Sequence, residues 1–313
     1  MFYKFDRHIE IIDIPKECGH NSLIKCISFF RDYLKRNKPS ILLSFSAPFN
    51  MVSIVSSIGL NIRTIVCERN DPRFIPFNAL QRFFRNCLYL FADGILTQTE
   101  HNKEYFSKVL QKKTTVIYNP IFINQALIGS KRYEDNNHII ISVARLKEQK
   151  NQKMLISAFS KFSKSHPDYK LLIWGEGDER GELENQINEL SLEQKVLLPG
   201  VSENIFQELS KGEIFVLSSN FEGMPNTLIE AMCLGLPCIS TKVSGATDLI
   251  KDGVNGLLIE INAENQLIMA MEKLTGDDSL RKEIGENASK IYDELNVEVI
   301  SNKWIKYIEN FVK

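Results

Sequence analysis

Short apolar runs rich in β-branched residues alternate with segments of helical period along almost the whole chain. Parallel strands need long crossovers, usually helices, so this alternation is typical of an α/β protein with parallel sheets. In the first half we expect strands at His8–Ile14, Ile41–Phe45, Arg63–Cys67, Gly94–Gln98 and Thr115–Tyr118. In the second half we expect them at Ile139–Val143, Lys170–Trp174, Lys195–Leu198, Ile214–Leu217, Pro237–Ser240 and Gly256–Ile259. The sequence therefore predicts two successive doubly wound, Rossmann-like units.

Helices are expected where apolar residues recur every three or four positions. These segments are Ser22–Arg36, Pro76–Phe91, His101–Leu110, Gln152–Ser165, Ile205–Lys211 and Thr227–Leu234. From Ala263 onward the pattern is helical without further strands. It ends in Val297–Val312, where Trp304, Ile308 and Phe311 are spaced to share one face.

The length of 313 residues predicts two domains, because domains commonly contain about 100–200 residues. The break falls after Pro120, where the polar run 129–137 precedes the next apolar segment, a composition typical of a linker. We expect an N-terminal domain over 1–125, a linker over 126–137 and a C-terminal domain over 138–295. Residues 296–313 then form a final helix that can pack back onto the first domain.

The formal net charge of -1 hides two oppositely charged halves. Residues 1–137 carry 19 Lys and Arg against 12 Asp and Glu, a net +7, whereas residues 138–313 carry 19 against 27, a net -8. One interpretation is compositional drift or attraction between the two domains. The other is that the basic half faces an anionic partner such as phosphate or a membrane surface. Nucleic acid is not expected, because the chain as a whole has no excess of cations.

The six cysteines form no CxxC pair and have no histidine at metal-ligand spacing, which argues against a disulfide framework or a zinc site. Four of them lie in apolar runs, where we expect free, buried thiols in a reduced, cytoplasmic compartment: Cys67, Cys87, Cys233 and Cys238. The chain begins without the apolar stretch of a signal peptide.

The most apolar window, Ala79–Leu96, contains Arg82, Arg85 and Asp93, so it is too charged to span a bilayer. A core helix is the favoured interpretation of this window. The alternative is a helix that lies on a membrane, since its aromatic residues stand beside the arginines.

The densest chemical signal is Phe221–Met232, which follows a buried strand and leads into an apolar helix. A strand, a glycine-containing loop and a helix N-terminus direct backbone N–H groups and the positive dipole end at one point, which suits phosphate or sugar oxygens. Glu222 lies at the mouth of the loop and Glu230 about one turn inside the helix, so the two carboxylates can accept hydrogen bonds from different parts of one ligand. As isolated residues, a first-turn acid and a surface acid are the simpler interpretation.

Two further segments end at the same predicted sheet edge. Ser142–Asn151 runs from a buried strand into a basic turn, where Arg145 can offer a bidentate guanidinium and Lys150 a point charge to a diphosphate. Asn151 is placed to cap the following helix. Gly175 and Gly177 follow the next strand and allow the backbone to pass close to a ligand. Taken alone, Arg145 and Lys150 are more simply interpreted as solvated surface charges, and the two glycines are a weak signal.

The ordered motifs together resemble the family 4 glycosyltransferases, which are retaining enzymes of the GT-B fold, with two Rossmann-like domains facing a cleft. The matching segments are Ser142–Leu146 with Lys150–Asn151, Gly175–Gly177, Leu198–Val201, Glu222–Met232 and Gly235–Thr241. The resemblance covers nearly the whole chain and is most specific over Ile139–Glu260. Asn119–Pro120 is similar to the interdomain turn of the family and is expected to be structural.

The resemblance implies a role for each matching residue. Arg145 and Lys150 correspond to the cations that hold the donor diphosphate, and with Glu222 they form the expected catalytic set. Glu222 and Glu230 correspond to the two acids of the E-x7-E motif, which contact the transferred sugar and the donor ribose. The other donor-binding residues implied are Gly175, Gly177, Val201, Gly223, Met224, Pro225, Asn226, Thr227 and Leu228. No metal or cofactor is implied, because the two cations and the helix terminus take that place.

On the acceptor side, Cys67–Pro72 is similar to the bacterial subgroup that builds capsule, O-antigen and other lipid-linked glycans. Glu68, Arg69, Asn70 and Asp71 are therefore candidate acceptor-side residues. A buried salt bridge between Glu68 and the neighbours of Arg69 is an equally weighted alternative for the same residues. Relatives begin with a strand, a glycine-rich loop and a helix, whereas residues 1–40 contain only Gly19. We accordingly expect an N-terminal domain that lacks its first β-loop-α unit.

The implied activity is retaining transfer of a hexose or N-acetylhexosamine from a nucleotide sugar, UDP-linked, to a lipid-linked or oligosaccharide acceptor in capsule, O-antigen or exopolysaccharide synthesis. The alternatives are a non-catalytic nucleotide-binding partner subunit, an inactive truncated homologue, and a GT-B-type epimerase, for which no additional acid/base set is identified. The implied location is the cytoplasm, with peripheral contact between the basic N-terminal half and the anionic inner face of the plasma membrane.

Overall fold

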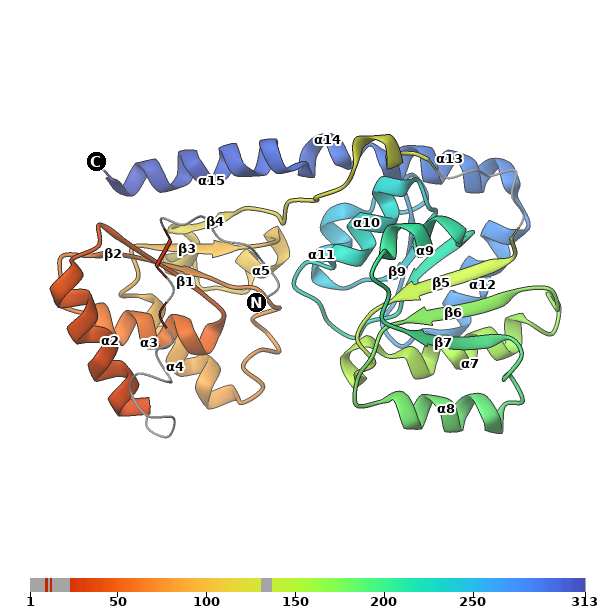
Figure 1. Cartoon of the computed structure of the whole chain (residues 1–313), viewed down its shortest axis with the longest axis horizontal. Helices are drawn as coiled ribbons and strands as arrows, with labels where there is room; N and C mark the ends of the chain where they lie inside the picture. The colour runs from red at the N-terminus through yellow and green to blue at the C-terminus, as the bar shows by residue number, and fades with distance from the viewer. Residues whose placement is uncertain (1–8, 11, 13–22, 131–136, 313) are drawn as a thin grey trace.

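In the computed structural model the chain forms two α/β units, each built on a parallel sheet (Figure 1). The structure describes residues 9, 10, 12, 23–130 and 137–312. The strand expected over His8–Ile14 lies mostly outside these residues, and Ile9, Glu10 and Ile12 are not in a strand. The two parallel sheets confirm the α/β class expected from the alternation of strands and helices.

The first unit has a four-stranded sheet in the order β1-β2-β3-β4. Its strands are β1 (Ile41–Phe45), β2 (Arg63–Cys67), β3 (Gly94–Thr97) and β4 (Thr114–Val116), with α2 (Leu23–Asn37), α3 (Ala47–Ser57), α4 (Ala79–Tyr89), α5 (Glu100–Glu104) and α6 (Lys108–Gln111) between or beside them. The single helix expected over His101–Leu110 is wrong. Thr99 and Ser107 each accept a backbone N–H with their hydroxyl oxygen, and these two caps divide the segment into α5 and α6.

The second unit has a six-stranded sheet in the order β10-β9-β8-β5-β6-β7. Its strands are β5 (Ile139–Val143), β6 (Lys170–Trp174), β7 (Val196–Gly200), β8 (Ile214–Leu217), β9 (Cys238–Thr241) and β10 (Leu257–Ile259). The covering helices are α7 (Gln152–Phe162), α8 (Arg180–Glu189), α9 (Ile205–Lys211), α10 (Asn226–Leu234), α11 (Ser244–Leu249), α12 (Glu264–Thr275) and α13 (Asp278–Ser289). Helices on both faces explain why central residues such as Ile140, Ile141 and Val216 are fully buried.

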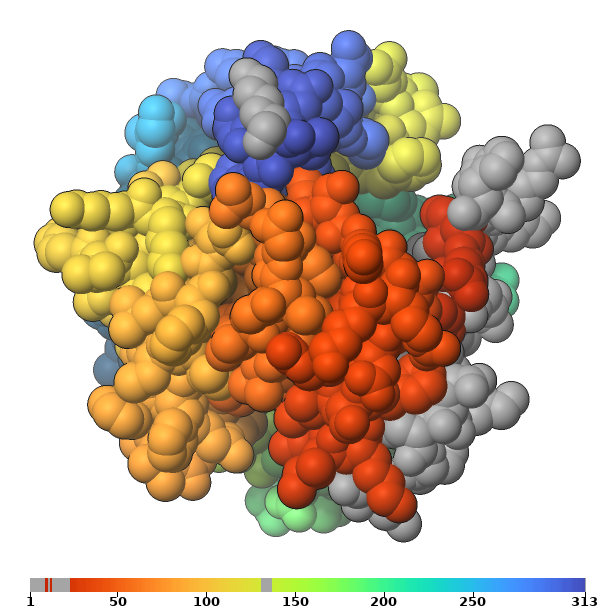
Figure 2. Space-filling view, turned by 90° about the vertical axis from the view of Figure 1, so that its left-hand side faces the viewer, coloured from red at the N-terminus to blue at the C-terminus, as the bar shows by residue number. Residues whose placement is uncertain are grey.

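The chain then returns to the first unit through α14 (Tyr292–Leu295) and the long α15 (Val297–Val312), which Figure 2 shows in blue across the top of that unit. The Trp304 ring lies 6.2 Å from the ring of Phe45 at the end of β1. Gly94 at the start of β3 lies so close to Tyr307 and Phe311 that a Cβ there would collide with both rings. The face predicted for Trp304, Ile308 and Phe311 is the one that packs on the core.

Helix α4 faces the opposite way from the favoured interpretation of its sequence. Arg85 and Tyr89 are fully buried, whereas Leu80, Phe83 and Phe84 are 61%, 61% and 52% exposed. The expectation of a core helix is therefore wrong for the apolar side of α4, which faces solvent. The polar side of the helix faces inward because it contacts the buried acid Glu68. The thiol of Cys87 is exposed with the apolar side, against expectation, while those of Cys67, Cys233 and Cys238 are buried and free. No helix in the described ranges is long and apolar enough to cross a membrane.

Candidate active site

Two loops at the carboxyl ends of the neighbouring strands β5 and β8 form the base of the candidate site. Hydrogen bonds that involve the backbone join them. Ser218 Oγ donates to the Lys150 carbonyl at 2.9 Å, the Asn220 N–H to the Gln149 carbonyl at 2.8 Å, and Gln149 Nε2 to the Phe221 carbonyl at 2.8 Å. The basic turn and the acidic loop, 70 residues apart in sequence, are thereby held as one unit.

Lys150 and Glu222 form an ion pair at the centre of this unit. Lys150 Nζ lies 2.5 Å from Glu222 Oε1, and Ser219 Oγ donates to the same oxygen at 2.6 Å. Glu222 is only 6% exposed, so its charge needs these partners to compensate for lost solvation. The pair presents a cation and a carboxylate at one point, which suits a ligand that carries both phosphate and hydroxyl groups.

Helix α10 begins beside this ion pair, after Pro225 at the N-cap position. No side chain caps the helix, so the first-turn N–H groups near Asn226 and Thr227 are available to an anion. Leu228 and Ile229 are buried behind them and fix the helix against β8 and β9. The expected donor-binding segment 223–228 thus contains the loop before α10 and the first turn of the helix, next in sequence to Glu222.

Arg145 extends from the basic turn with an exposed side chain, and among the described residues its guanidinium has no ion-pair partner. Gly175 and Gly177 pack against this turn: a Cβ at either position would collide with the carbonyl oxygen of Ala144 or Leu146. The Leu146 N–H donates to the Glu176 carbonyl at 2.9 Å. The close approach that these two glycines allow is therefore to the backbone that carries Arg145.

Asn151 occupies the position before α7, but its side chain does not cap the helix as expected. Its backbone is left-handed, at φ 51° and ψ 41°. Its Nδ2 instead donates to Asn220 Oδ1 at 3.2 Å and to Asn262 Oδ1 at 2.8 Å, so the side chain joins its own turn to the loops after β8 and β10.

Glu230 lies one turn into α10, half-buried, and no described residue makes a hydrogen bond or ion pair with its carboxyl group. Burial raises the pKa of Glu230 to about 7. A carboxyl group kept in this setting without a partner can accept hydrogen bonds from ligand hydroxyls. Val201 follows Gly200 at the end of β7 and is 73% exposed, so its surface is free for contact with a flat ring.

The acceptor-side candidates divide into two pairs. Glu68 is 2% exposed, accepts a hydrogen bond from the Tyr89 hydroxyl at 2.6 Å and lies 3.5 Å from Arg85 Nη1. Burial raises the pKa of Glu68, and the charge of Arg85 opposes the rise. For Glu68 the structure thus shows a buried salt bridge, and the partner is Arg85 of α4. Asp71, also buried, accepts the Arg73 N–H at 2.9 Å and shapes its own loop.

Arg69 and Asn70 lie directly against the loop before α10. A Cβ on Gly223 would stand 2.6 Å from the Arg69 carbonyl oxygen and 3.0 Å from Asn70 Cα, so only glycine permits this approach. Asn119 bridges the two units: it accepts from Arg69 Nη2 at 2.9 Å and donates to Asn226 Oδ1 at 2.7 Å. The sequence predicts only a structural turn at Asn119, and its spatial neighbours reveal this contact.

A cleft of about 650 Å³ opens between the units beside these residues. Asn70 and Phe77 line it from the first unit, and Arg145, Gln149 and Phe221 from the second. The Phe221 ring stacks on Phe74 at 4.7 Å between centroids, which closes one wall with aromatic side chains. The cleft therefore brings the exposed guanidinium of Arg145 and the acceptor-side loop to one space.

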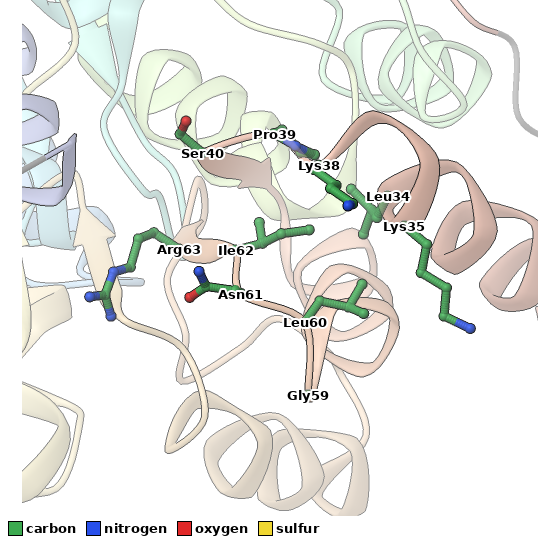
Figure 3. Close-up of a pocket in the computed structure, with 10 residues that line it drawn as sticks. All are labelled: Leu34, Lys35, Lys38, Pro39, Ser40, Gly59, Leu60, Asn61, Ile62 and Arg63. Atoms are coloured by element: carbon green, nitrogen blue, oxygen red, sulfur yellow. The ribbon is translucent and has the colours of Figure 1, made fainter.

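A second hollow, of about 720 Å³, lies away from the cleft, near the amino ends of β1 and β2 (Figure 3). Lys35, Lys38 and Arg63 are among its lining residues. Ligands of doubly wound folds bind outside the carboxyl ends of the strands, so this hollow is not the expected site. In the described part of the chain, no group of three or more His, Cys, Asp or Glu could hold a metal ion.

A helix N-terminus beside a cationic turn, at the carboxyl ends of a parallel sheet, suits an anionic ligand such as phosphate, and the facing unit supplies a second wall for a larger ligand. Residues 125–291 match the family described as Glycosyl transferases group 1. The chain belongs to this family, and it is a glycosyltransferase.

Two enzymes and one solved structure illustrate the similarity. The N-acetylgalactosamine-N,N'-diacetylbacillosaminyl-diphospho-undecaprenol 4-alpha-N-acetylgalactosaminyltransferase of Campylobacter jejuni is 36% identical over 89% of this chain and 76% of its own length. The UDP-Gal:alpha-D-GlcNAc-diphosphoundecaprenol alpha-1,3-galactosyltransferase of Escherichia coli is 27% identical over 93% of this chain and 81% of its own length. The structure of HepE from Anabaena in complex with UDP has the same fold, with a TM-score of 0.80 at 21% identity over 91% of this chain and 82% of that one.

Proposed function

We propose that the protein transfers a hexose or N-acetylhexosamine, with retention, from a UDP-sugar to a lipid-linked acceptor in the synthesis of a bacterial surface glycan. The observation that carries the proposal is the Lys150–Glu222 ion pair at the uncapped N-terminus of α10, directly opposite Arg69 and Asn70. The names of the Campylobacter and Escherichia relatives, which specify diphospho-undecaprenol acceptors, support the choice of acceptor.

The donor is held by its diphosphate and by its sugar hydroxyls. Arg145, Lys150 and the first N–H groups of α10 bind the diphosphate, and Lys150 exchanges Glu222 for a phosphate oxygen as the donor enters. Glu222 then accepts a hydroxyl of the transferred sugar. Glu230 accepts the ribose hydroxyls, and Val201 contacts the base.

The remaining donor contacts come from the backbone of the loop before α10. Gly223, Met224, Pro225 and Asn226 lie along the sugar, and Thr227 and Leu228 lie at the distal phosphate. Arg69 and Asn70 face the acceptor, whereas Glu68 and Asp71 hold the shape of their loop.

In the reaction, the acceptor hydroxyl attacks the anomeric carbon from the face that UDP leaves. The bond between the anomeric carbon and the phosphate oxygen breaks, and the proton of the acceptor hydroxyl passes to that oxygen. Arg145, Lys150 and the dipole of α10 stabilise the charge that develops on the departing diphosphate. No covalent intermediate with the protein is required.

The test is transfer from radiolabelled UDP-sugars to a polyprenyl-diphosphate-linked glycan by the wild type and by Glu222→Gln. We expect the variant to bind UDP almost normally in calorimetry while transfer falls by about 100-fold or more, since a contact that strengthens in the transition state is lost. Glu193→Gln, an exposed acid elsewhere on this unit, is the matched control. Unchanged turnover of Glu222→Gln would contradict the assignment. Binding of UDP without transfer from any donor would instead favour a nucleotide-binding partner subunit.

A further inference from the structure

Helix α4 presents its apolar side to solvent. We define the α4 patch as the exposed apolar residues on the helix and its two flanks: Phe77, Leu80, Phe83, Phe84, Leu90 and Phe91, which are 52–77% exposed. Leu80, Phe83 and Phe84 are spaced by three and four residues, so they lie on one face of the helix. Single exposed apolar residues are ordinary, but a group of this size on one element marks an interaction surface.

The opposite side of α4 is fixed to the protein by polar contacts. Arg85 donates to the carbonyls of Ile75 at 2.7 Å and Pro72 at 3.1 Å, and lies 3.5 Å from the Glu68 carboxylate. Tyr89 donates to Glu68 and receives a hydrogen bond from Asn50 Nδ2 at 2.8 Å. Rotating the helix to bury the patch would leave Glu68 buried without these partners, so the network holds the aromatic side outward.

Cations accompany the patch at both of its ends. The helix itself contains no Asp or Glu, and since Arg85 is buried on the opposite side, Arg82 is the arginine of α4 that reaches the surface. The Arg82 guanidinium donates to the carbonyls of Pro76 and Phe77 at one end, and Lys113 Nζ donates to those of Leu90 and Ala92 at the other. The nearby acid Asp93 is paired with Arg63 at 2.9 Å. Aromatic residues on one face with basic residues beside them are typical of helices that lie in an anionic membrane interface.

The patch is continuous with the candidate active site. Phe77 belongs both to the patch and to the cleft that contains Asn70 and Arg145. Arg85 binds the same loop, 68–75, that carries the acceptor-side residues. A surface that covers α4 therefore lies next to the mouth of the cleft.

We propose that α4 docks the protein on a membrane rich in anionic phospholipid, with the α4 patch inserted among the headgroups and the cleft opening at the membrane surface. The link to a lipid-linked acceptor rests on the proposed function. The docking itself depends only on the patch and its cations.

The test is flotation of the full chain with vesicles of phosphatidylglycerol and phosphatidylethanolamine, compared with vesicles of phosphatidylcholine, without donor or acceptor. We expect the wild type to float with the anionic vesicles. The double variant with Phe83→Ser and Phe84→Ser should bind these vesicles more weakly by roughly tenfold or more. It lacks the two rings whose transfer from water into the membrane favours binding. Leu80→Ser is the second patch variant, and Phe122→Ser, which changes an 85% exposed residue outside the patch, is the control. Circular dichroism checks that every variant is folded.

Three results would overturn the proposal: no flotation of the wild type with anionic vesicles, equal flotation of the patch variants, or a dimer of the wild type that the patch variants dissociate without any vesicle binding. Transfer to a water-soluble, short-chain acceptor in detergent separates this proposal from the proposed function. We expect the patch variants to retain that transfer. Flotation without transfer by the wild type overturns only the function, and transfer without flotation overturns only the docking.

Discussion

Helices α10 and α4 each follow a strand that ends at the cleft, yet α10 buries its apolar side and α4 buries its polar side. In α10 the apolar side, including Leu228 and Met232, is buried and the N-terminus is left for a ligand. In α4 the buried residues are Arg85 and Tyr89, and the phenylalanines face solvent. Apolar periodicity therefore defines a face without deciding which way it points. A buried polar partner, here Glu68, can reverse the direction.

Removing the partner that orients α4 should have the largest effect on stability. Arg85→Ala leaves Glu68 buried without its compensating charge, and we expect a loss of about 3–5 kcal/mol in the free energy of unfolding, measured with urea. Lys112→Ala, an exposed change in the same unit, is the control and should stay within about 0.5 kcal/mol. A loss below about 1 kcal/mol for Arg85→Ala would mean that the ion pair does not orient the helix.

Truncation of the buried side of α10 comes next. Leu228 is fully buried, so Leu228→Ala should cost about 3 kcal/mol, within the range of 2–5 for such cavities. Chemical unfolding followed by circular dichroism measures the change. A cost near zero would show that α10 is held by its loop rather than by its core contacts.

At Glu230 we expect a single substitution to raise stability and to weaken ligand binding. We expect no such combination for the residues of α4. Its folded-state pKa of about 7 lies above the unfolded value, so the acid form is favoured in the native state and stability falls as pH rises from about 4.5 to 7. Glu230→Gln should therefore be more stable than the wild type at pH 8, by about 1–3 kcal/mol, and no different at pH 4.

The same substitution should weaken UDP binding at pH 8, because a carboxylate accepts hydroxyl hydrogen bonds more strongly than an amide. Unfolding and calorimetry at the two pH values measure both effects. Equal stability of the two proteins at pH 8 would contradict the assigned burial of the charged group.

The smallest change in stability is expected for Leu80 of α4, which we compare with Leu228 of α10. Leu80→Ala removes a side chain that is 61% exposed, so the free energy of unfolding should change by less than about 0.5 kcal/mol. Leu80→Ala and Leu228→Ala remove the same side-chain atoms. A difference between their effects on stability under the same conditions is therefore due to the burial of Leu228. A loss of 2 kcal/mol or more at Leu80 would show that the patch is covered in solution.

The strands were predictable because their physical signal is local. Runs such as Ile139–Val143 and Ile214–Leu217 are buried on both faces and agree with β5 and β8 to the residue. The segment His101–Leu110 failed because the caps at Thr99 and Ser107 outweigh its helical period. The direction of α4 failed because Glu68 lies 17 residues before Arg85, beyond the reach of any periodic pattern.

The residues expected to bind the donor likewise lie in contiguous sequence motifs. Lys150, Glu222 and the start of α10 could therefore be predicted from the sequence. The pairing of Lys150 with Glu222 and the bridge from Asn119 to Asn226 depend on how two strands and two units meet. Gly223 is a further example. Its motif predicts a donor-binding role, but the structure shows that a side chain at this position would collide with the backbone of Arg69 on the other unit.

The return of the chain through α15 has a consequence for protein engineering. The two crossings between the units lie side by side, with the Ile121 N–H donating to the Leu295 carbonyl at 2.8 Å. The final helix then rests on β1 and β3 rather than on the sheet that precedes it in sequence. A chimera that exchanges the second unit for that of a relative therefore needs two junctions, near residues 121 and 296. With a single junction, the final helix of the relative would replace α15 and lie against Gly94 of this chain.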